Sequence, residues 1–171
     1  MKQHEIAALF TQMADLLELR GDNPFRIRAY RTAAQNLESL TDDVERLARE
    51  NRLRTIPGIG QDLSDKIREY LTHSSIQAVE RLKRTVPAGV IALMDIPGIG
   101  PKTAKLLYQR LHITSVSQLE AAARAHRLRR LPGFQETKEQ NILKGIGIVR
   151  KGQERMDLGL AFSTARHILE V

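Results

Sequence analysis

The sequence predicts an all-α protein made of two small helical domains. Apolar residues recur at spacings of three and four along the whole chain, and no stretch of useful length alternates as a β-strand does. The hexapeptide TIPGIG at residues 55–60 returns forty positions later as DIPGIG at residues 95–100. A Pro-Gly turn between two helical segments is typical of a helical hairpin. We therefore expect helices that are joined by a repeated hairpin.

Three helices are predicted before the first hairpin. Gly21 can end the first of them, because glycine adopts the left-handed conformation of a helix C-cap. Asn23 can cap the next helix, over residues 25–40, and Thr41 can cap a short one over residues 41–51. The apolar stripe of the first helix, which predicts a face packed on a core, consists of Ile6, Leu9, Phe10, Met13, Leu16 and Leu17.

A domain boundary is expected near residue 85. The segment TVP interrupts the helical pattern there, and the charge balance changes: residues 1–85 carry 14 Lys and Arg against 13 Asp and Glu, whereas residues 86–171 carry 13 against 7. The second domain should hold one hairpin at residues 91–111 and a degenerate third one at residues 126–147. Its predicted helices cover residues 89–95, 101–111, 115–126, 136–149 and 154–170.

The composition narrows the classes of function. The net charge is +7, which favours a polyanionic partner such as nucleic acid. The chain has no cysteine, so disulfides and thiolate metal sites are excluded, and its few histidines lack the spacing of metal ligands. The N-terminal segment has neither a signal-peptide core nor a membrane span. A cytoplasmic protein without a membrane partner is the expectation.

The hairpin has the geometry of an anion site. Ile56 precedes a proline and is displaced from the α region, so the preceding helix must stop. Gly58 and Gly60 can adopt positive φ angles and, having no Cβ, let a ligand approach the backbone. Helices then begin at Gln61 and at Pro101, with unpaired amides and the positive end of the helix dipole at the turn. A nucleic-acid phosphate would suit this arrangement, held without reading of sequence.

The second copy is the stronger candidate for phosphate binding. Gly98 and Gly100 repeat the glycine pair, and Lys102, Thr103 and Lys105 follow the turn. Cations and a hydroxyl beside free amides are typical of a contact with the nucleic-acid backbone.

The other two copies are expected to bind phosphate less well. Asp62 and Asp65 follow the first turn and place negative charge beside it. In the third copy, LPGFQ at residues 131–135, Gly133 is kept but Gln135 replaces the second glycine. A purely structural use of the hairpins also stays open. In that case the chain is a protein-interaction scaffold, whose hairpin isoleucines set the crossing of the helices.

The segments GDNPFRIRAYRTAAQNLESL and VPAGVIALMDIPGIGPKTAKLLYQRL, together with the two spaced hairpins, make the chain similar to a known family. It resembles the N-terminal portion of bacterial family X DNA polymerases, relatives of polymerase beta, over essentially its whole length. The resemblance implies tandem helix-hairpin-helix motifs that bind gapped or nicked DNA in base excision repair, without sequence specificity. It implies a monomer associated with the nucleoid.

The resemblance also implies roles for particular residues. Lys66 falls at the position of the Schiff-base lysine of a 5′-deoxyribose phosphate lyase, with Asp65 as its acidic neighbour. Arg26 and Tyr30 fall at positions that line the 5′-phosphate pocket. Asp62, however, stands where the family has a second lysine, and an Asp62–Lys66 pair of adjacent helical turns would stabilise the unreactive ammonium form. Lyase activity through Lys66 is therefore an alternative to plain DNA binding.

No polymerase active site is expected in this chain. The nearest acidic pair, Asp42 and Asp43, lies at a predicted helix start and lacks the Gly-Ser context of a nucleotidyl-transfer site. A fragment of a longer polymerase and a natural short relative both fit this observation.

A monovalent cation, Na⁺ or K⁺, is implied at each hairpin by the same resemblance. The ligands would be backbone carbonyl oxygens near Ile56 and Ile59 in the first copy and near Ile96 and Ile99 in the second. The side chains of these isoleucines are expected in the core.

Overall fold

The computed structural model describes residues 1–169, with side chains for residues 1–160, and the chain divides into two compact units. Unit 1 is Met1–Ala88 and unit 2 is Gly89–Val171, so the division lies a few residues beyond the expected one. Every regular element of the described residues is a helix, which confirms the all-α prediction. None of these helices combines the length and apolarity needed to cross a membrane.

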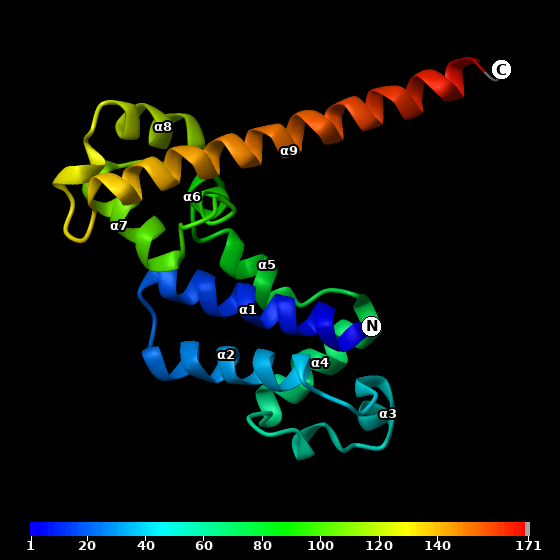
Figure 1. The fold of residues 1–171 in the computed structure, drawn as a ribbon. Coiled ribbons are helices and arrows are strands. Elements are labelled where there is room, and N and C mark those ends of the chain that lie inside the picture. Colours follow the sequence, from blue (N-terminus) through cyan, green and yellow to red (C-terminus); the bar gives the residue numbers. More distant parts are fainter. Residues whose placement is uncertain (170–171) are drawn as a thin grey trace. The chain divides into compact units, whose positions relative to one another are not determined.

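Unit 1 is built on two long helices that pack along each other, α1 and α2 (Figure 1). Phe10 of α1 meets Tyr30 of α2 edge to face, with ring centroids 5.6 Å apart. Arg31 of α2 reaches Asp15 and Glu18 of α1 at 3.1 and 2.5 Å. The elements of this unit are α1 (Lys2–Arg20), α2 (Pro24–Glu38), α3 (Val44–Arg49), the 3₁₀ turn η1 (Leu53–Thr55), α4 (Gln61–His73) and α5 (Gln77–Lys83).

The helix ends of unit 1 agree with the sequence at two caps and differ at one. Gly21 ends α1 in the left-handed conformation, and the Asn23 side chain accepts a hydrogen bond from the Phe25 amide at the start of α2. The prediction of Thr41 as the third cap is wrong. The Asp43 side chain caps α3 instead, accepting a hydrogen bond from the Glu45 amide at 3.0 Å, because a carboxylate favours the positive end of the helix.

Unit 2 contains the second and third hairpins and ends in a long helix. Its elements are α6 (Ala88–Leu93, whose first residue belongs to unit 1), α7 (Pro101–Leu111), α8 (Val116–Arg124), the 3₁₀ turn η2 (Leu128–Arg130) and α9 (Glu136–Leu169). Helices α8 and α9 pack against each other. The Arg150 guanidinium of α9 forms an ion pair with Glu120 of α8.

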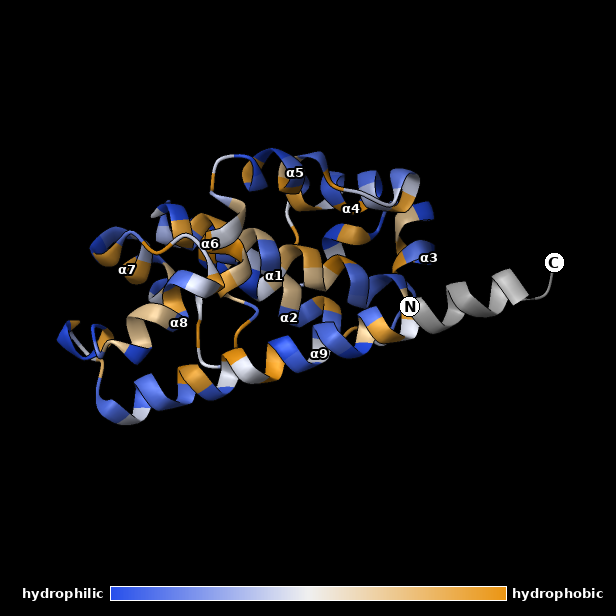
Figure 2. Ribbon diagram, turned by 90° about the horizontal axis from the view of Figure 1, so that it is seen from above, coloured by the Kyte–Doolittle hydropathy of each residue, from blue (hydrophilic) through white to orange (hydrophobic). Residues whose placement is uncertain are grey.

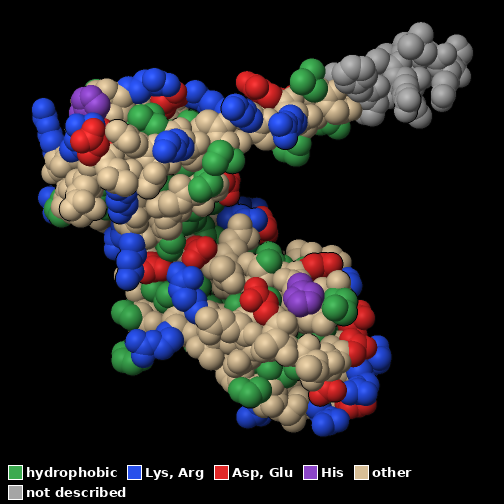
Figure 3. All heavy atoms as spheres, viewed as in Figure 1, with side chains coloured by type: hydrophobic (Ala, Val, Ile, Leu, Met, Phe, Trp, Pro, Cys, Tyr) green, Lys and Arg blue, Asp and Glu red, His purple; other side chains and the backbone are tan. Residues whose placement is uncertain are grey.

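The prediction of two separate helices after residue 135 is wrong, because α9 continues through residues 150–153. The intervening segment RKGQ contains no proline and no Ser, Thr, Asp or Asn that could cap a new helix. Its one glycine costs only about 1 kcal/mol inside a helix relative to alanine. Hydrophobic and hydrophilic residues alternate along α9 (Figure 2). Exposed Lys and Arg side chains follow the same helix (Figure 3), among them Arg150, Lys151 and Arg155.

Candidate nucleic-acid interface

The chain folds into the same hairpin three times, at residues 55–60 (hairpin 1), 95–100 (hairpin 2) and 131–135 (hairpin 3). The first glycine of each copy has a positive φ angle, 78° at Gly58, 90° at Gly98 and 76° at Gly133. The amide of the following residue donates a hydrogen bond to the carbonyl three residues earlier, at 3.1, 3.0 and 3.1 Å. The third hairpin is therefore complete in its backbone, although its sequence is degenerate.

The second glycine of the motif does not have a positive φ angle, contrary to expectation. Gly60 and Gly100 are the N-caps of α4 and α7 and have extended backbone, with φ of −87° and −91°. Any residue can adopt this conformation. Gln135 occupies the same position in the third copy, where its carbonyl accepts a hydrogen bond from the Glu139 amide at 3.1 Å.

The apolar residues around each turn are buried, which confirms their expected place in the core. Ile56 and Ile59 are 3% and 4% exposed. Ile96 and Ile99 are buried in the same way, as are their counterparts in the third copy. The turns are held from inside by these side chains, so the glycine corners keep their shape while they face solvent.

Hairpin 2 presents an open corner. A Cβ atom built on Gly98 or Gly100 would meet nothing within 4 Å. No side chain caps α7, and in the part of the chain that the structure describes the Gly100 and Thr103 amides donate no hydrogen bond. Lys102 beside them is exposed, and Lys105 is half-buried. This corner offers backbone donors and positive charge together, as an anion site requires.

Hairpin 1 is also exposed, but a side chain of α2 holds its turn and an acidic residue lies beside it. Its turn lies against α2, where the Asn36 side chain donates a hydrogen bond to the Pro57 carbonyl at 2.7 Å. A Cβ on Gly58 would come within 3.3 Å of Thr32 Cγ2. Asp62 lies in the first turn of α4, where its carboxylate competes with an incoming phosphate for the helix N-terminus.

Hairpin 3 rests on a buried carboxylate that the sequence interpretation did not single out. Glu139 is 1% exposed, and its Oε1 lies 2.8 Å from His126 Nδ1 and 2.8 Å from Arg129 Nε. Burial by itself raises the pKa of Glu139, but these hydrogen bonds and the Arg129 charge outweigh it and hold the pKa below its ordinary value of 4.5. The sequence could have indicated this buried acid, because residue 139 falls on the apolar stripe that Ile142 and Ile146 continue. An acid at such a position needs a buried partner.

Helix α9 also supports hairpin 2 directly. Gly145 of α9 is buried, and a Cβ atom there would lie 2.9 Å from Ile96 Cγ2 and 2.9 Å from the Pro97 carbonyl oxygen. Only glycine allows this approach of the helix to the turn. The helix that begins at hairpin 3 thus sets the position of hairpin 2.

Lys66 is paired as its spacing predicted. Its Nζ lies 2.5 Å from Asp62 Oδ1, and its side chain is only 14% exposed. Attack on a sugar aldehyde needs a neutral amine, whereas an adjacent carboxylate stabilises the ammonium form. The observed geometry does not favour a lyase nucleophile.

The two residues expected at a 5′-phosphate pocket lie in different surroundings. Arg26 is exposed in the first turn of α2. Tyr30 is 2% exposed, and its hydroxyl is buried without a hydrogen-bond partner. The expectation that Tyr30 contacts a phosphate does not fit this packing, because the Tyr30 ring is buried and lies edge to face with Phe10. An aromatic side chain that the sequence interpretation did not consider, Phe25, is 76% exposed next to Arg26.

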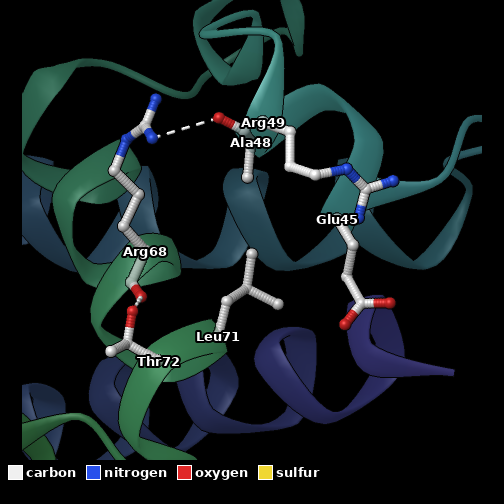
Figure 4. A pocket seen from close by; sticks show the side chains of 6 residues that line it. All are labelled: Glu45, Ala48, Arg49, Arg68, Leu71 and Thr72. Carbon is white, nitrogen blue, oxygen red and sulfur yellow. Dashed lines mark hydrogen bonds between the residues drawn. The ribbon is translucent and has the colours of Figure 1, made fainter.

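A depression of about 440 Å³ between α3 and α4 carries charges of both signs (Figure 4). Arg68 lines it and donates hydrogen bonds to the Ala48 carbonyl at 3.1 Å and to Asn51 Oδ1 at 2.9 Å. The first of these bonds supplies a donor to a carbonyl in the last turn of α3. The other lining residues are Glu45, Arg49, Leu71 and Thr72. Since a carboxylate shares the depression with the arginines, it does not suit a polyanion.

No group of three or more His, Asp or Glu side chains in the described residues is arranged to hold a metal ion. The carbonyl oxygens proposed for a monovalent cation are a different kind of ligand. In those residues the Ile56 and Ile96 carbonyls each accept one backbone hydrogen bond, and the Ile59 and Ile99 carbonyls accept none. Because a carbonyl oxygen has two lone pairs, all four retain capacity for a cation.

Comparison with known proteins finds a helix-hairpin-helix family model that matches within each unit. Residues 1–76 match the family model described as a helix-hairpin-helix domain. Residues 90–147 match the family model described as a SAM-like helix-hairpin-helix tandem. The second match contains hairpins 2 and 3 and ends just after the Gly145 contact.

Two relatives are DNA polymerases. The chain is 33% identical over 170 residues to DNA polymerase/3′-5′ exonuclease PolX of Bacillus subtilis (strain 168), covering 99% of this chain and 29% of that protein. It is 26% identical over 110 residues to DNA polymerase lambda of Arabidopsis thaliana, covering 64% of this chain and 20% of that protein. The chain thus spans less than a third of either relative. It carries helix-hairpin-helix domains and is homologous to family X DNA polymerases, and the match fits the N-terminal portion of such a polymerase.

Proposed function

We propose that this chain binds DNA through the phosphate backbone, without sequence specificity, as the N-terminal part of a family X repair polymerase does. The observation that carries the proposal is the open corner of hairpin 2. There the start of α7 places the Gly100 and Thr103 amides, which donate no hydrogen bond in the described residues, next to the exposed residue Lys102. Backbone amides at a helix N-terminus bind phosphate whatever the base sequence.

The two units contribute unequally in this proposal. Hairpin 2 makes the main contact, because no carboxylate lies in the first turn of α7. Hairpin 1 contributes less, since Asp62 lies in the first turn of α4, and hairpin 3 has Glu136 in the first turn of α9. The open corner at Gly133 makes hairpin 3 an auxiliary contact.

Gly100→Val tests the proposal without disturbing the fold. The Gly100 backbone is extended and a Cβ there meets nothing, so valine fits the chain but occupies the space of the phosphate. We expect affinity for duplex DNA to fall at least about tenfold, which corresponds to the loss of roughly 1.4 kcal/mol. Gly60→Val at hairpin 1 is the matched control and should have a smaller effect. Wild-type affinity in Gly100→Val, with an unchanged unfolding midpoint, would refute the proposal.

The salt dependence provides a second measurement. Each neutralised phosphate contributes close to one unit to the slope of log affinity against log salt. Lys102→Ala should lower that slope by about one and weaken binding equally for unrelated sequences. An affinity that does not change with salt would contradict a phosphate contact.

We propose further that a gapped or nicked duplex is preferred over an intact one, that the chain binds as a monomer, and that it associates with the nucleoid. Phe25 supports the first point, because an exposed aromatic ring next to Arg26 can stack on an unpaired base. Phe25→Ala should reduce the preference for gapped over intact duplex and leave binding to intact duplex unchanged. Light scattering of the complex tests the monomer.

A monovalent cation at hairpins 1 and 2 is proposed as part of the same contact. The carbonyl oxygens of Ile96 and Ile99 retain lone pairs at the corner where the phosphate is placed, and those of Ile56 and Ile59 do so at hairpin 1. Bound there, Na⁺ or K⁺ would supply positive charge between carbonyls and phosphate. DNA affinity in potassium or sodium chloride should exceed that in tetramethylammonium chloride at equal ionic strength. Equal affinities would exclude the cation.

A further inference from the structure

One face of helix α9 carries a stripe of exposed residues that belongs to none of the hairpin turns. Its members recur at alternating spacings of four and three, so they follow one another along a single side of the helix. Every member is exposed, and none is acidic. This basic stripe consists of Thr137, Asn141, Lys144, Ile148, Lys151 and Arg155.

The stripe depends on the continuity of α9. A break at residues 150–153, which the sequence suggested, would have removed the fixed register between Lys144 and the two cations that follow it. In the continuous helix, Lys144, Lys151 and Arg155 share one face. At 1.5 Å per residue the stripe extends about 27 Å from Thr137 to Arg155. The exposed cations along this helix are visible in Figure 3.

The three cations of the stripe have no ion pair in the part of the chain that the structure describes. Arg150 is paired with Glu120 of α8 and so does not contribute to this surface. Glu154, three residues from Lys151, is exposed at the edge of the stripe, and Asp157 lies away from it around the helix. The stripe therefore carries three positive charges against one acid at its edge, and an anionic partner would be attracted to it.

The stripe adjoins the open corner of hairpin 2. Gly145 packs against Ile96 and Pro97 of that turn, and Lys144 is the residue before it, on an exposed side of α9. A strand that is held at the Gly100 corner can therefore continue onto the stripe without leaving unit 2.

The residue types of the stripe fit the backbone of a nucleic acid. Lys and Arg neutralise phosphates, and Thr and Asn side chains donate hydrogen bonds to phosphate oxygens. Ile148, which is 62% exposed between the cations, offers an apolar surface to the sugars. A helix that lies on a membrane surface has a broad apolar face, whereas only one of the six residues of this stripe is apolar.

We infer that the basic stripe of α9 binds the phosphate backbone of duplex DNA beside the contact at hairpin 2. The inference rests on the proposed DNA binding and extends it to residues that no hairpin turn contains. A length of about 27 Å corresponds to roughly eight base pairs at 3.4 Å each. Unit 2 thus covers a longer stretch of duplex than its hairpins alone.

An exchange of two side chains tests the stripe at constant composition. Lys151→Gln removes one cation of the stripe, and glutamine has a helix propensity similar to that of lysine. Lys151→Gln combined with Gln153→Lys is the matched control. It restores the net charge but places the cation on a different side of α9, where residue 153 is exposed. The affinity of the full chain for a duplex at least twice as long as the stripe is measured over a range of salt concentrations.

We expect Lys151→Gln to lower the slope of log affinity against log salt by about one and to weaken binding several-fold. The exchanged variant should behave like Lys151→Gln, because the position of the charge matters. Wild-type affinity and slope in the exchanged variant would show that net charge alone acts, and would overturn the inference. Unchanged binding in Lys151→Gln would overturn it too.

Two parallel measurements separate the alternatives. If Lys151→Gln weakens binding to phosphatidylserine vesicles but not to duplex DNA, the stripe belongs to a membrane contact and the inference is wrong. If Gly100→Val weakens duplex binding but the stripe variants do not, the proposed function stands and only the inference fails. Absence of duplex binding in the wild type would instead remove the proposed function itself.

Discussion

Gly145→Ala is expected to displace hairpin 2 without touching any proposed DNA contact. The new methyl group would lie 2.9 Å from the Pro97 carbonyl oxygen and 2.9 Å from Ile96 Cγ2, distances at which the turn must move. One of these atoms belongs to the backbone, so the strain cannot be relieved by rotating a side chain. The variant therefore tests whether α9 determines the position of the open corner.

The magnitude follows from two opposing terms. Alanine inside a helix is about 1 kcal/mol more favourable than glycine. Overpacking of a well-filled contact costs about 1 to 3 kcal/mol. Gly147, two residues further along α9, meets nothing within 4 Å and provides the matched control with the same gain in helix propensity. The difference in free energy of unfolding between the two alanine variants therefore isolates the clash, about 1 to 3 kcal/mol.

Urea unfolding and DNA binding of both variants are the assays. Gly147→Ala should be more stable than the wild type and bind DNA normally. Gly145→Ala should be less stable than Gly147→Ala and bind DNA several-fold more weakly, because the Gly100 corner has shifted. Equal stabilisation by both substitutions, with equal DNA affinity, would refute the reasoning.

Three further predictions concern buried and paired groups. The pKa of Glu139 is below 4.5 in the folded chain, so its contribution to stability is complete above pH 4.5 and is lost as the pH falls through the lowered value; Glu139→Gln should flatten this acid dependence of unfolding. Tyr30→Phe removes a buried hydroxyl that has no partner and should raise the free energy of unfolding by about 1 kcal/mol with unchanged DNA affinity; a loss of affinity would restore Tyr30 as a DNA contact. Borohydride should trap little adduct between Lys66 and an abasic strand, and Asp62→Ala should increase trapping if the ion pair suppresses the amine; an adduct that persists in Lys66→Ala would assign it to another residue.

Features that depend on neighbouring residues were predictable from the sequence. The buried isoleucines of the hairpins follow from apolar periodicity, and the stop before Pro57 follows from the restriction that proline places on Ile56, whose ψ is 125°. The positive φ angles at Gly58 and Gly98 follow from the turn itself. The Asp62–Lys66 pair follows from helical spacing.

Features that depend on how helices pack were not predictable in this way. The burial of Tyr30 depends on Phe10 of a different helix. The hydrogen-bond partners of Glu139, His126 and Arg129, lie before the turn of hairpin 3 and not on α9. The continuity of α9 was missed because a single glycine lowers helix propensity without ending the helix.

The sequence by itself determined that the chain is helical, that it repeats a glycine turn and that its second half is basic, since these properties are set by adjacent residues and by composition. Only the tertiary structure decided which turn presents open amides and which glycine lets α9 pack closely against hairpin 2. The physical reason is that convergence of side chains from separate helices depends on the packing of a shared core, and no spacing along the chain records it.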